Sequence, residues 1–168
     1  MRPKSQNTEE SEKKDGSMPL IQYAQQHPIP KSLLRSVILD FDSYADFIPQ
    51  VRSCVAKEVG VGVWEVAIEL FVIRRLQYRI RMEEKEEGHL VWDVLEGVFT
   101  INRGFWKLEE NPDGCLVQYE VEIQLGTFLP SLITKKVQEK AIPQLIVAFV
   151  EEATRRISVP SKSVRDDN

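Results

Sequence analysis

Apolar and polar residues alternate along most of the chain between residues 51 and 125. From 64 to 72, for example, every even position is apolar, whereas Glu65 and Glu69 stand at odd positions. A period of two places one row of side chains on a buried face of a β-strand and the other row in water. The strands follow one another with short turns, so we expect an antiparallel meander with one solvated face. The pattern predicts strands over residues 20–26, 51–59, 64–72, 75–82, 90–96, 99–108 and 115–125.

A different period marks the end of the chain, where apolar residues recur every three or four positions from 130 to 157. This spacing predicts one long amphipathic helix. Pro143 stands inside it. Because a proline removes one backbone hydrogen bond, we expect the helix to bend there. Two shorter helices are predicted ahead of the strands, over residues 31–40 and 44–47.

Neither the sheet nor the terminal helix can bury its apolar face alone. A sheet that curls around the helix buries both faces and can leave a hollow between them. We therefore predict an α+β fold in which a curved antiparallel sheet wraps around a long C-terminal helix. Such an interior suits a binding cavity better than a catalytic centre.

The ends of the chain differ in composition from its middle. The first 17 residues have no large apolar side chain after Met1, and their four basic and four acidic residues cancel. A segment of this kind has too little apolar surface to offset the entropy lost on ordering, so we expect a disordered leader. Residues 18–158 are predicted to form one ligand-binding domain and residues 159–168 a flexible tail.

Charge and cysteine content narrow the classes of function. The net charge of −4 does not favour nucleic acid, which needs clustered positive charge. Cys54 and Cys115 have no CxxC spacing, and no apolar signal segment precedes them, so we expect reduced thiols in a cytoplasmic protein. His27 and His89 stand apart from both cysteines, so neither a metal site nor a cofactor is predicted. No segment approaches the ~20 apolar residues that span a bilayer.

Three motifs resemble those of a known family. Residues 37–51 (VILDFDSYADFIPQV) follow the form D-h-x-x-Y-x-x-F-h-P-x-h, in which h is apolar. Residues 95–99 (LEGVF) and 104–108 (GFWKL) are similar to a G-P-F-x…G-x-W-x-h strand pair, with Val98 where proline is common. Phe128-Leu129-Pro130 then leads into the last helix. Together these resemble the START-like polyketide cyclase/dehydrase and coenzyme Q-binding family.

The resemblance implies a helix-grip fold, in which the sheet holds the C-terminal helix over an apolar cavity. It also implies binding of lipids, quinones or polyketide-like molecules. Because one fold hosts many activities, a family name that contains "cyclase" does not make this chain an enzyme. Tyr44, Phe47 and Pro49 of the first motif are expected to be structural, since they can pin a short helix against the sheet.

Three tryptophans are the leading ligand-binding candidates. Trp64, Trp92 and Trp106 are each predicted on the apolar face of a different strand. An indole offers a large apolar ring and one N–H donor, which suits a planar or polyprenyl ligand. Simple core packing explains the same residues, and both interpretations stay open. The remaining ligand-binding candidates share these inward faces: Val66, Ile68, Leu76, Tyr78, Ile80, Val94, Asn102, Tyr119, Val121, Ile123, Phe128, Ile133, Val137, Ala141 and Leu145.

Catalytic chemistry has one candidate. Glu96 shares its alternation face with Trp92 and Val94, and an inward carboxyl would have its pKa raised by desolvation and could act as an acid or base. Asn102 and Tyr119 would offer hydrogen bonds nearby. The simpler interpretation, which we favour, leaves Glu96 in water at the strand end.

A basic run stands on the predicted solvated face. It comprises Arg74, Arg75, Arg79 and Arg81, opposite Glu65 and Glu69. Cross-strand ion pairing accounts for it. A membrane-facing or RNA-facing patch is the alternative, although neighbouring glutamates oppose it.

Three hypotheses of function follow. The leading one is binding of a hydrophobic small molecule, namely a lipid, an isoprenoid quinone or an aromatic polyketide. The second is a cyclase or dehydratase acting on a polyketide-like substrate. The third, which rests on the resemblance, is a regulator that binds the translation machinery. A transient membrane contact stays open, no nucleic acid is expected, and the sequence names no protein partner.

Overall fold

The computed structural model describes residues 20–126 and 129–158. The predicted leader (1–17) and tail (159–168) lie outside these ranges, as does Phe128.

Seven strands form one antiparallel sheet in the order β1-β7-β6-β5-β4-β3-β2. From β2 to β7 each strand pairs with its neighbour in sequence, which confirms the predicted meander. The first strand, β1, pairs with β7. The strands are β1 (Ile21–His27), β2 (Val51–Gly60), β3 (Val63–Val72), β4 (Arg74–Glu86), β5 (His89–Gly97), β6 (Phe99–Asn111) and β7 (Gly114–Leu125).

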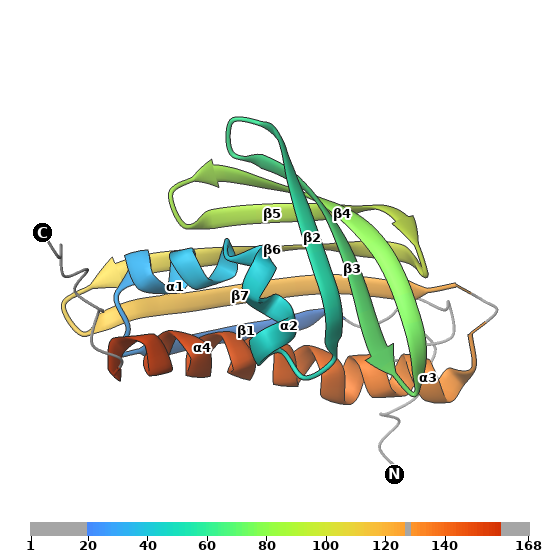
Figure 1. The fold of residues 1–168 in the computed structure, drawn as a ribbon. Helices are drawn as coiled ribbons and strands as arrows, with labels where there is room; N and C mark the ends of the chain where they lie inside the picture. Colours follow the sequence, from blue (N-terminus) through green and yellow to red (C-terminus); the bar gives the residue numbers. More distant parts are fainter. Residues whose placement is uncertain (1–19, 127–128, 159–168) are drawn as a thin grey trace, which may run out of the picture.

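The helical elements lie before and after the main run of strands. The first group is α1 (Lys31–Ile38), the 3-10 turn η2 (Phe41–Ser43) and α2 (Tyr44–Phe47). The second group is α3 (Ser131–Lys136), η3 (Val137–Ala141) and α4 (Ile142–Ser158). Figure 1 shows the sheet curling around the long second group, so the predicted α+β helix-grip architecture is confirmed.

The predicted alternation matches the burial of side chains. In β7 every odd position from Cys115 to Leu125 is buried, and every even position is partly exposed. The outer face carries the predicted ion pairs: Arg79 Nη2 lies 3.1 Å from Glu65 Oε2, and Arg75 Nε lies 2.9 Å from Glu69 Oε1. The period of two therefore assigned the two faces of the sheet correctly.

The hairpin turns are tight. The β2–β3 turn consists of Val61 and Gly62, and Gly62 has a φ of 68°, which glycine adopts without steric cost. The β3–β4 turn is tighter, since Val72 pairs with Arg74 and Ile73 alone forms the tip. Ile73 has a φ of 66°, a left-handed conformation that costs a residue with a Cβ roughly 1–2 kcal/mol.

The terminal helix changes pitch at η3, a turn of π-helix. The turn ends two residues before Pro143, whose ring lacks an N–H and clashes with the carbonyl four residues earlier in a regular α-helix. A π-turn widens the backbone and so accommodates the proline. We expected a bend at the proline, and the structure has a π-turn immediately before it. In the described residues, no helix is long and apolar enough to cross a bilayer.

The π-turn also shifts the buried face of the helix. A strict repeat of four residues predicts Leu145 after Ile133, Val137 and Ala141. The additional residue in the turn rotates the later residues, so Ile142, Ile146 and Phe149 are buried while Leu145 is only half-buried.

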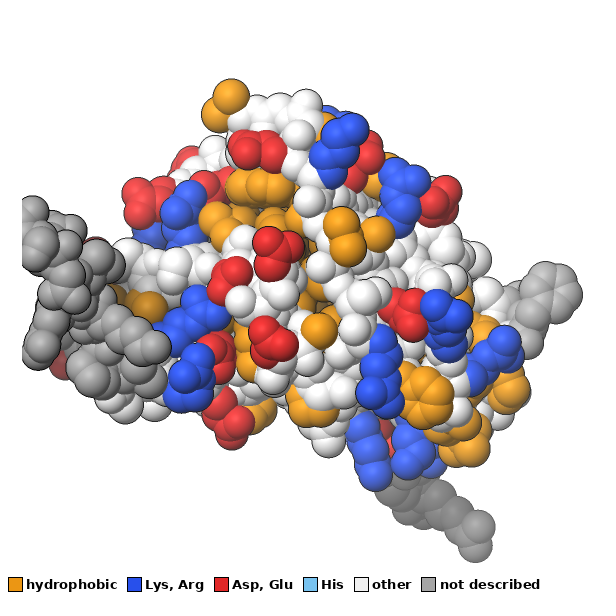
Figure 2. Space-filling model, viewed as in Figure 1, with side chains coloured by type: hydrophobic (Ala, Val, Ile, Leu, Met, Phe, Trp, Pro, Cys, Tyr) orange, Lys and Arg blue, Asp and Glu red, His pale blue; other side chains and the backbone are white. Residues whose placement is uncertain are grey.

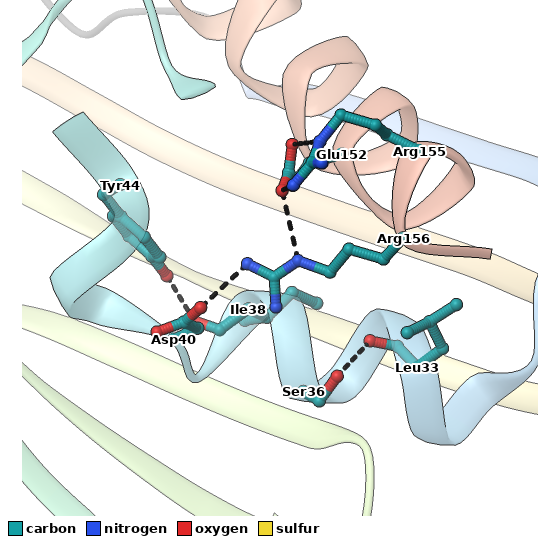
Figure 3. Close-up of polar contacts among 8 residues, drawn as sticks. All are labelled: Leu33, Ser36, Ile38, Asp40, Tyr44, Glu152, Arg155 and Arg156. Carbon is teal, nitrogen blue, oxygen red and sulfur yellow. Dashed lines mark hydrogen bonds and ion pairs between the residues drawn. The ribbon is translucent and has the colours of Figure 1, made fainter. Parts of the chain in front are cut away.

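A buried carboxylate ties α4 to the segment after α1. Glu152 is 9% exposed, and its carboxylate accepts hydrogen bonds from Arg155 at 2.6 Å and from Arg156 at 3.1 Å. Arg156 Nη2 also donates to Asp40 Oδ2 at 2.8 Å (Figure 3). The hydrogen bond from Arg155, reinforced by Arg156, holds the pKa of Glu152 below its ordinary value. Nearby, the Tyr44 hydroxyl donates to the carbonyl of Ile38.

Replacement of Glu152 tests this cluster. We expect Glu152→Gln to lower the free energy of unfolding at pH 7 by about 1–3 kcal/mol, because two arginines lose their anionic partner. The folded pKa is depressed, so the stabilisation is present above the unfolded pKa of about 4.3 and is lost as pH falls through the folded pKa. Chemical denaturation between neutral and acidic pH should therefore show a shallower loss of stability in the variant.

Glu151→Gln is the matched control, since Glu151 is exposed on the same turn of α4. Equal losses in the two variants would contradict a specific role for the Glu152 cluster.

Candidate functional site

A cavity of about 70 Å³ lies between the concave face of the sheet and α4. Five strands contribute to it, β3 to β7, together with α2 and α4. Its lining residues are Tyr44, Ile68, Tyr78, Ile80, Met82, Trp92, Asn102, Trp106, Tyr119, Val121, Ile142, Leu145 and Phe149. The wall is therefore largely aromatic and aliphatic, and its polar side chains are neutral.

Aromatic rings form a continuous wall from the sheet to the helix. The ring of Tyr119 lies 5.5 Å from that of Trp92 and 4.6 Å from that of Trp106, measured between centroids. Trp106 in turn contacts Phe149 of α4 at 5.3 Å, with the rings edge to face. These separations are typical of favourable aromatic pairs, which hold the rings in fixed positions.

Asn102 places an amide at the sheet side of the cavity. It is 7% exposed, and its Oδ1 accepts a hydrogen bond from Trp92 Nε1 at 3.0 Å. The bond satisfies the indole N–H, which would otherwise be buried without a partner. It also fixes the orientation of the Trp92 ring in the aromatic wall.

Two tyrosine hydroxyls reach the same space. Within the described residues, neither Tyr78 nor Tyr119 has a hydrogen-bond partner for its hydroxyl, whereas Tyr44 has Ile38. Burial raises the pKa of both Tyr78 and Tyr119 far above the ordinary value for a phenol. Both therefore remain neutral and can donate a hydrogen bond as well as accept one.

The cavity is small. A volume of about 70 Å³ corresponds to about two water molecules, whereas pockets for drug-sized ligands span roughly 300–1,000 Å³. A larger ligand can therefore enter only if the wall moves. The π-turn and Pro143 lie at the end of the helix that carries Ile142 and Leu145, and they are the part of the wall with the least regular hydrogen bonding.

Nine of the residues predicted from the sequence line this cavity. The structure brings together Ile68, Tyr78, Ile80, Trp92, Asn102, Trp106, Tyr119, Val121 and Leu145. Trp92 and Trp106 are among them, and each also packs in the core, so the two interpretations of these tryptophans do not exclude each other.

Eight predicted residues lie on the inward faces but do not line the cavity. They are Trp64, Val66, Leu76, Val94, Ile123, Ile133, Val137 and Ala141. Alternation identifies the face of a strand and not the position along it, and these side chains pack where neighbouring side chains fill the space. Trp64, for example, contacts Phe41 at 5.9 Å between ring centroids. Phe128, also predicted, lies outside the described residues.

Four lining residues were not predicted as ligand-binding. Met82 continues the alternation of Tyr78 and Ile80, and Phe149 stands on the apolar stripe of the helix, so both signals were present in the sequence. Ile142 enters the wall because of the π-turn, which no periodicity indicates. Tyr44 was expected to be structural, and it both packs against Phe149 and reaches the cavity.

Glu96 does not point inward. Its side chain is 63% exposed, and Oε1 lies 2.9 Å from Arg79 Nη1 on the outer face. The hypothesis of a buried acid or base at this position is therefore wrong, and the favoured interpretation is confirmed. The preceding bulge explains the change of side, because the pairing of β4 with β5 shifts register between Arg79 and Ile80.

The thiols and other metal-ligating groups are dispersed. Cys54 and Cys115 are free and buried. Burial raises the pKa of the Cys54 thiol to about 12, so it is protonated at neutral pH. In the part of the chain that the structure describes, no three His, Cys, Asp or Glu residues are grouped so as to hold a metal ion.

Comparison with known proteins assigns the family. The family described as polyketide cyclase / dehydrase and lipid transport matches residues 28–150, well over half of the chain. The chain belongs to this family. No curated protein matches it in sequence.

Several solved structures share the fold of this chain. The Zhui aromatase/cyclase from Streptomyces sp. R1128 is 16% identical with a TM-score of 0.72, over 87% of this chain and 99% of that one. A START superfamily protein from Mycobacterium smegmatis is 14% identical with a TM-score of 0.68, over 82% and 98%. A STAR-related lipid transfer protein from Xanthomonas axonopodis is 13% identical with a TM-score of 0.66, over 80% and 85%. At such identities the likeness shows a shared fold.

The bond between Trp92 and Asn102 can be tested by a double-mutant cycle. We expect Asn102→Ala to lower the free energy of unfolding by about 1–3 kcal/mol, because the buried indole N–H loses its acceptor. In a Trp92→Phe background, which has no such donor, the same replacement should cost less. Urea denaturation of the four proteins measures the difference.

Glu96→Gln serves as the surface control and should change the free energy of unfolding by less than about 0.5 kcal/mol. Equal costs of Asn102→Ala in both backgrounds would contradict a stabilising hydrogen bond.

Proposed function

We propose that the cavity between the sheet and α4 binds a hydrophobic small molecule that carries a carbonyl or hydroxyl oxygen. The observation that carries this proposal is the pair of hydroxyls, on Tyr78 and Tyr119, that have no partner within the described residues and reach an otherwise aromatic wall. Both side chains line the cavity, so their hydroxyls are available to a group inside it. A ligand oxygen could accept a hydrogen bond from each, an interaction that phenylalanine would not offer.

The chemistry of the wall supports a ring system as the apolar part of the ligand. Trp92, Trp106 and Phe149 offer ring faces and edges at fixed positions, which suit stacking with a planar molecule. Aromatic polyketides and quinones combine such rings with carbonyl oxygens. A lipid with a polar end is the third member of this class, and two proteins that share the fold are an aromatase/cyclase and a lipid transfer protein.

Entry of such a ligand requires the wall to open. A bicyclic ring system is larger than the cavity of about 70 Å³. We infer that the helix moves outward at the π-turn, where regular hydrogen bonding is already interrupted. Ile142 and Leu145 would then separate from Ile68 and Tyr78.

Two matched probes test the proposal. Menadione, a methylnaphthoquinone, has the ring system of methylnaphthalene with two added carbonyl oxygens. We expect calorimetry on the full chain to give tighter binding of menadione than of methylnaphthalene. Tyr119→Phe should weaken menadione binding about fivefold to tenfold, the value of one hydrogen bond, and leave methylnaphthalene binding unchanged.

Tyr23→Phe is the control, since the Tyr23 hydroxyl bonds to His27 on the edge strand, away from the cavity. Binding of neither probe would overturn the proposal. Equal binding of the two probes would remove the role given to the hydroxyls.

A second replacement tests the location of the ligand. We expect Leu145→Trp to abolish binding of both probes, because the larger ring fills the space between helix and sheet. Val147→Trp is its control, since Val147 is exposed on the same helix. Equal affinities of the two variants would place the ligand elsewhere.

A cyclase or dehydratase that acts on a polyketide-like substrate is the second candidate function. The same neutral hydroxyls favour it, because a phenol that donates to a substrate carbonyl makes the carbonyl carbon more electrophilic. Turnover of a poly-β-keto substrate that falls in Tyr119→Phe and not in Tyr23→Phe would support it. The third hypothesis, a regulator of the translation machinery, stays a prediction.

A further inference from the structure

The tip of the β3–β4 hairpin exposes apolar side chains. Phe71 is 47% exposed and Ile73, at the tip itself, is 51% exposed. Leu132 of α3 is 55% exposed. Large apolar side chains in one region of a surface mark a site of interaction more often than scattered ones do.

An isoleucine is unusual at the backbone position that Ile73 occupies at the tip. Its left-handed conformation is one that glycine adopts freely and that a β-branched residue adopts rarely. Burial of the isoleucine side chain does not offset the cost of this backbone conformation, since about half of the side chain lies in water. A strained residue with an exposed apolar side chain suggests a use for that side chain outside the fold.

Exposed basic residues lie in the same segments as these side chains. We name the combined surface the tip patch; it consists of Phe71, Ile73, Leu132, Arg52, Arg74, Arg75, Lys135, Lys136 and Lys140. Figure 2 shows hydrophobic side chains with Lys and Arg around them in the region of the β3–β4 tip and the start of the terminal helix.

Contacts connect the hairpin tip to the segment 50–53 and, through it, to α4. The N–H of Phe71 donates to the carbonyl of Gln50 at 2.8 Å, and the guanidinium of Arg52 lies 5.3 Å from the centroid of the Phe71 ring. The side chain of Gln50 bonds to that of Gln144 on α4, one turn beyond Lys140. In the view of Figure 1 the hairpin tip is seen over the start of the long helix.

The charge of the tip patch is opposite to that of the whole chain. The segments 50–53, 69–76 and 131–141 contain six basic and two acidic residues, whereas the chain has a net charge of −4. Arg75 is paired with Glu69. Among the described residues, the other five cations have no ion-pair partner, so their charges remain available to an external anion.

We propose that the tip patch docks on the surface of an anionic bilayer. Apolar side chains at a protruding tip can enter the interfacial region, while the surrounding lysines and arginines approach lipid phosphates. Each such cation contributes about fivefold to affinity for an anionic membrane. The tip patch has both apolar and basic side chains, whereas binding to an acidic protein surface would require only the basic ones. The proposal is independent of the ligand that the cavity holds.

Docking in this orientation would place the wall of the cavity at the membrane. Ile68 and Tyr78 belong to the docked hairpin, and Ile142 follows the π-turn of the docked helix. An apolar ligand could then pass between bilayer and cavity without crossing water.

Vesicle co-sedimentation of the full chain tests the docking. We expect binding to phosphatidylcholine vesicles in which about one lipid in three is phosphatidylglycerol, little binding to phosphatidylcholine alone, and weaker binding as salt is added. Lys140→Glu should lower the affinity at least about tenfold, because a cation is replaced by an anion. Ile73→Gly should lower it about tenfold while leaving the unfolding midpoint equal to or above that of the wild type.

The far hairpin supplies matched controls. Val61→Ser and Lys57→Glu change an exposed apolar and an exposed basic residue on the β2–β3 hairpin, at the other end of the strands, and should bind as the wild type does. The proposal is overturned by equal binding to neutral and anionic vesicles, by no binding, or by tip variants that bind like the controls. Binding to immobilised polyglutamate without binding to vesicles would also overturn it, in favour of an acidic protein partner.

Discussion

Mutual burial of the terminal helix and the concave face of the sheet is the interaction on which the rest of the structure depends. Phe149 shows how closely the two are joined, since its ring contacts Trp106 of the sheet at 5.3 Å and Tyr44 of α2 at 5.1 Å. Within residues 20–126 and 129–158 no second sheet covers this one, so the helix supplies the other layer. The ion pairs of Glu152 and Arg156 then fix the C-terminal end of that layer against the segment after α1.

The other end of the helix is built differently. There the π-turn and Pro143 replace regular hydrogen bonding, and no buried ion pair holds the helix down among the described residues. Stability is therefore unevenly distributed along one element, as it is in many proteins whose binding regions open locally. The cavity, with its two tyrosine hydroxyls, and the basic tip patch all lie towards this less constrained end or beside it. A single region can thus combine access to the interior with contact to an external surface.

Much of this arrangement could be predicted from the sequence. Alternation assigned the inward row of β7 and β3 correctly, and nine of the predicted ligand-binding residues line the cavity. The same reasoning failed where local geometry breaks the period. A bulge turned Glu96 outward to Arg79, and the π-turn brought Ile142, which was not predicted, into the wall beside Leu145. Neither irregularity has a signature in the spacing of apolar residues, because both depend on how the backbone meets its neighbours.

The order of strands, the long helix and the apolar face of each were determined by the sequence itself, since periods of two and of three to four residues follow directly from backbone geometry. The tertiary structure alone decided which inward residues meet in a cavity and how small that cavity is. It also decided that basic residues from three separate segments share one surface. Periodicity identifies the face on which a side chain lies, whereas packing in three dimensions determines which distant side chain lies opposite.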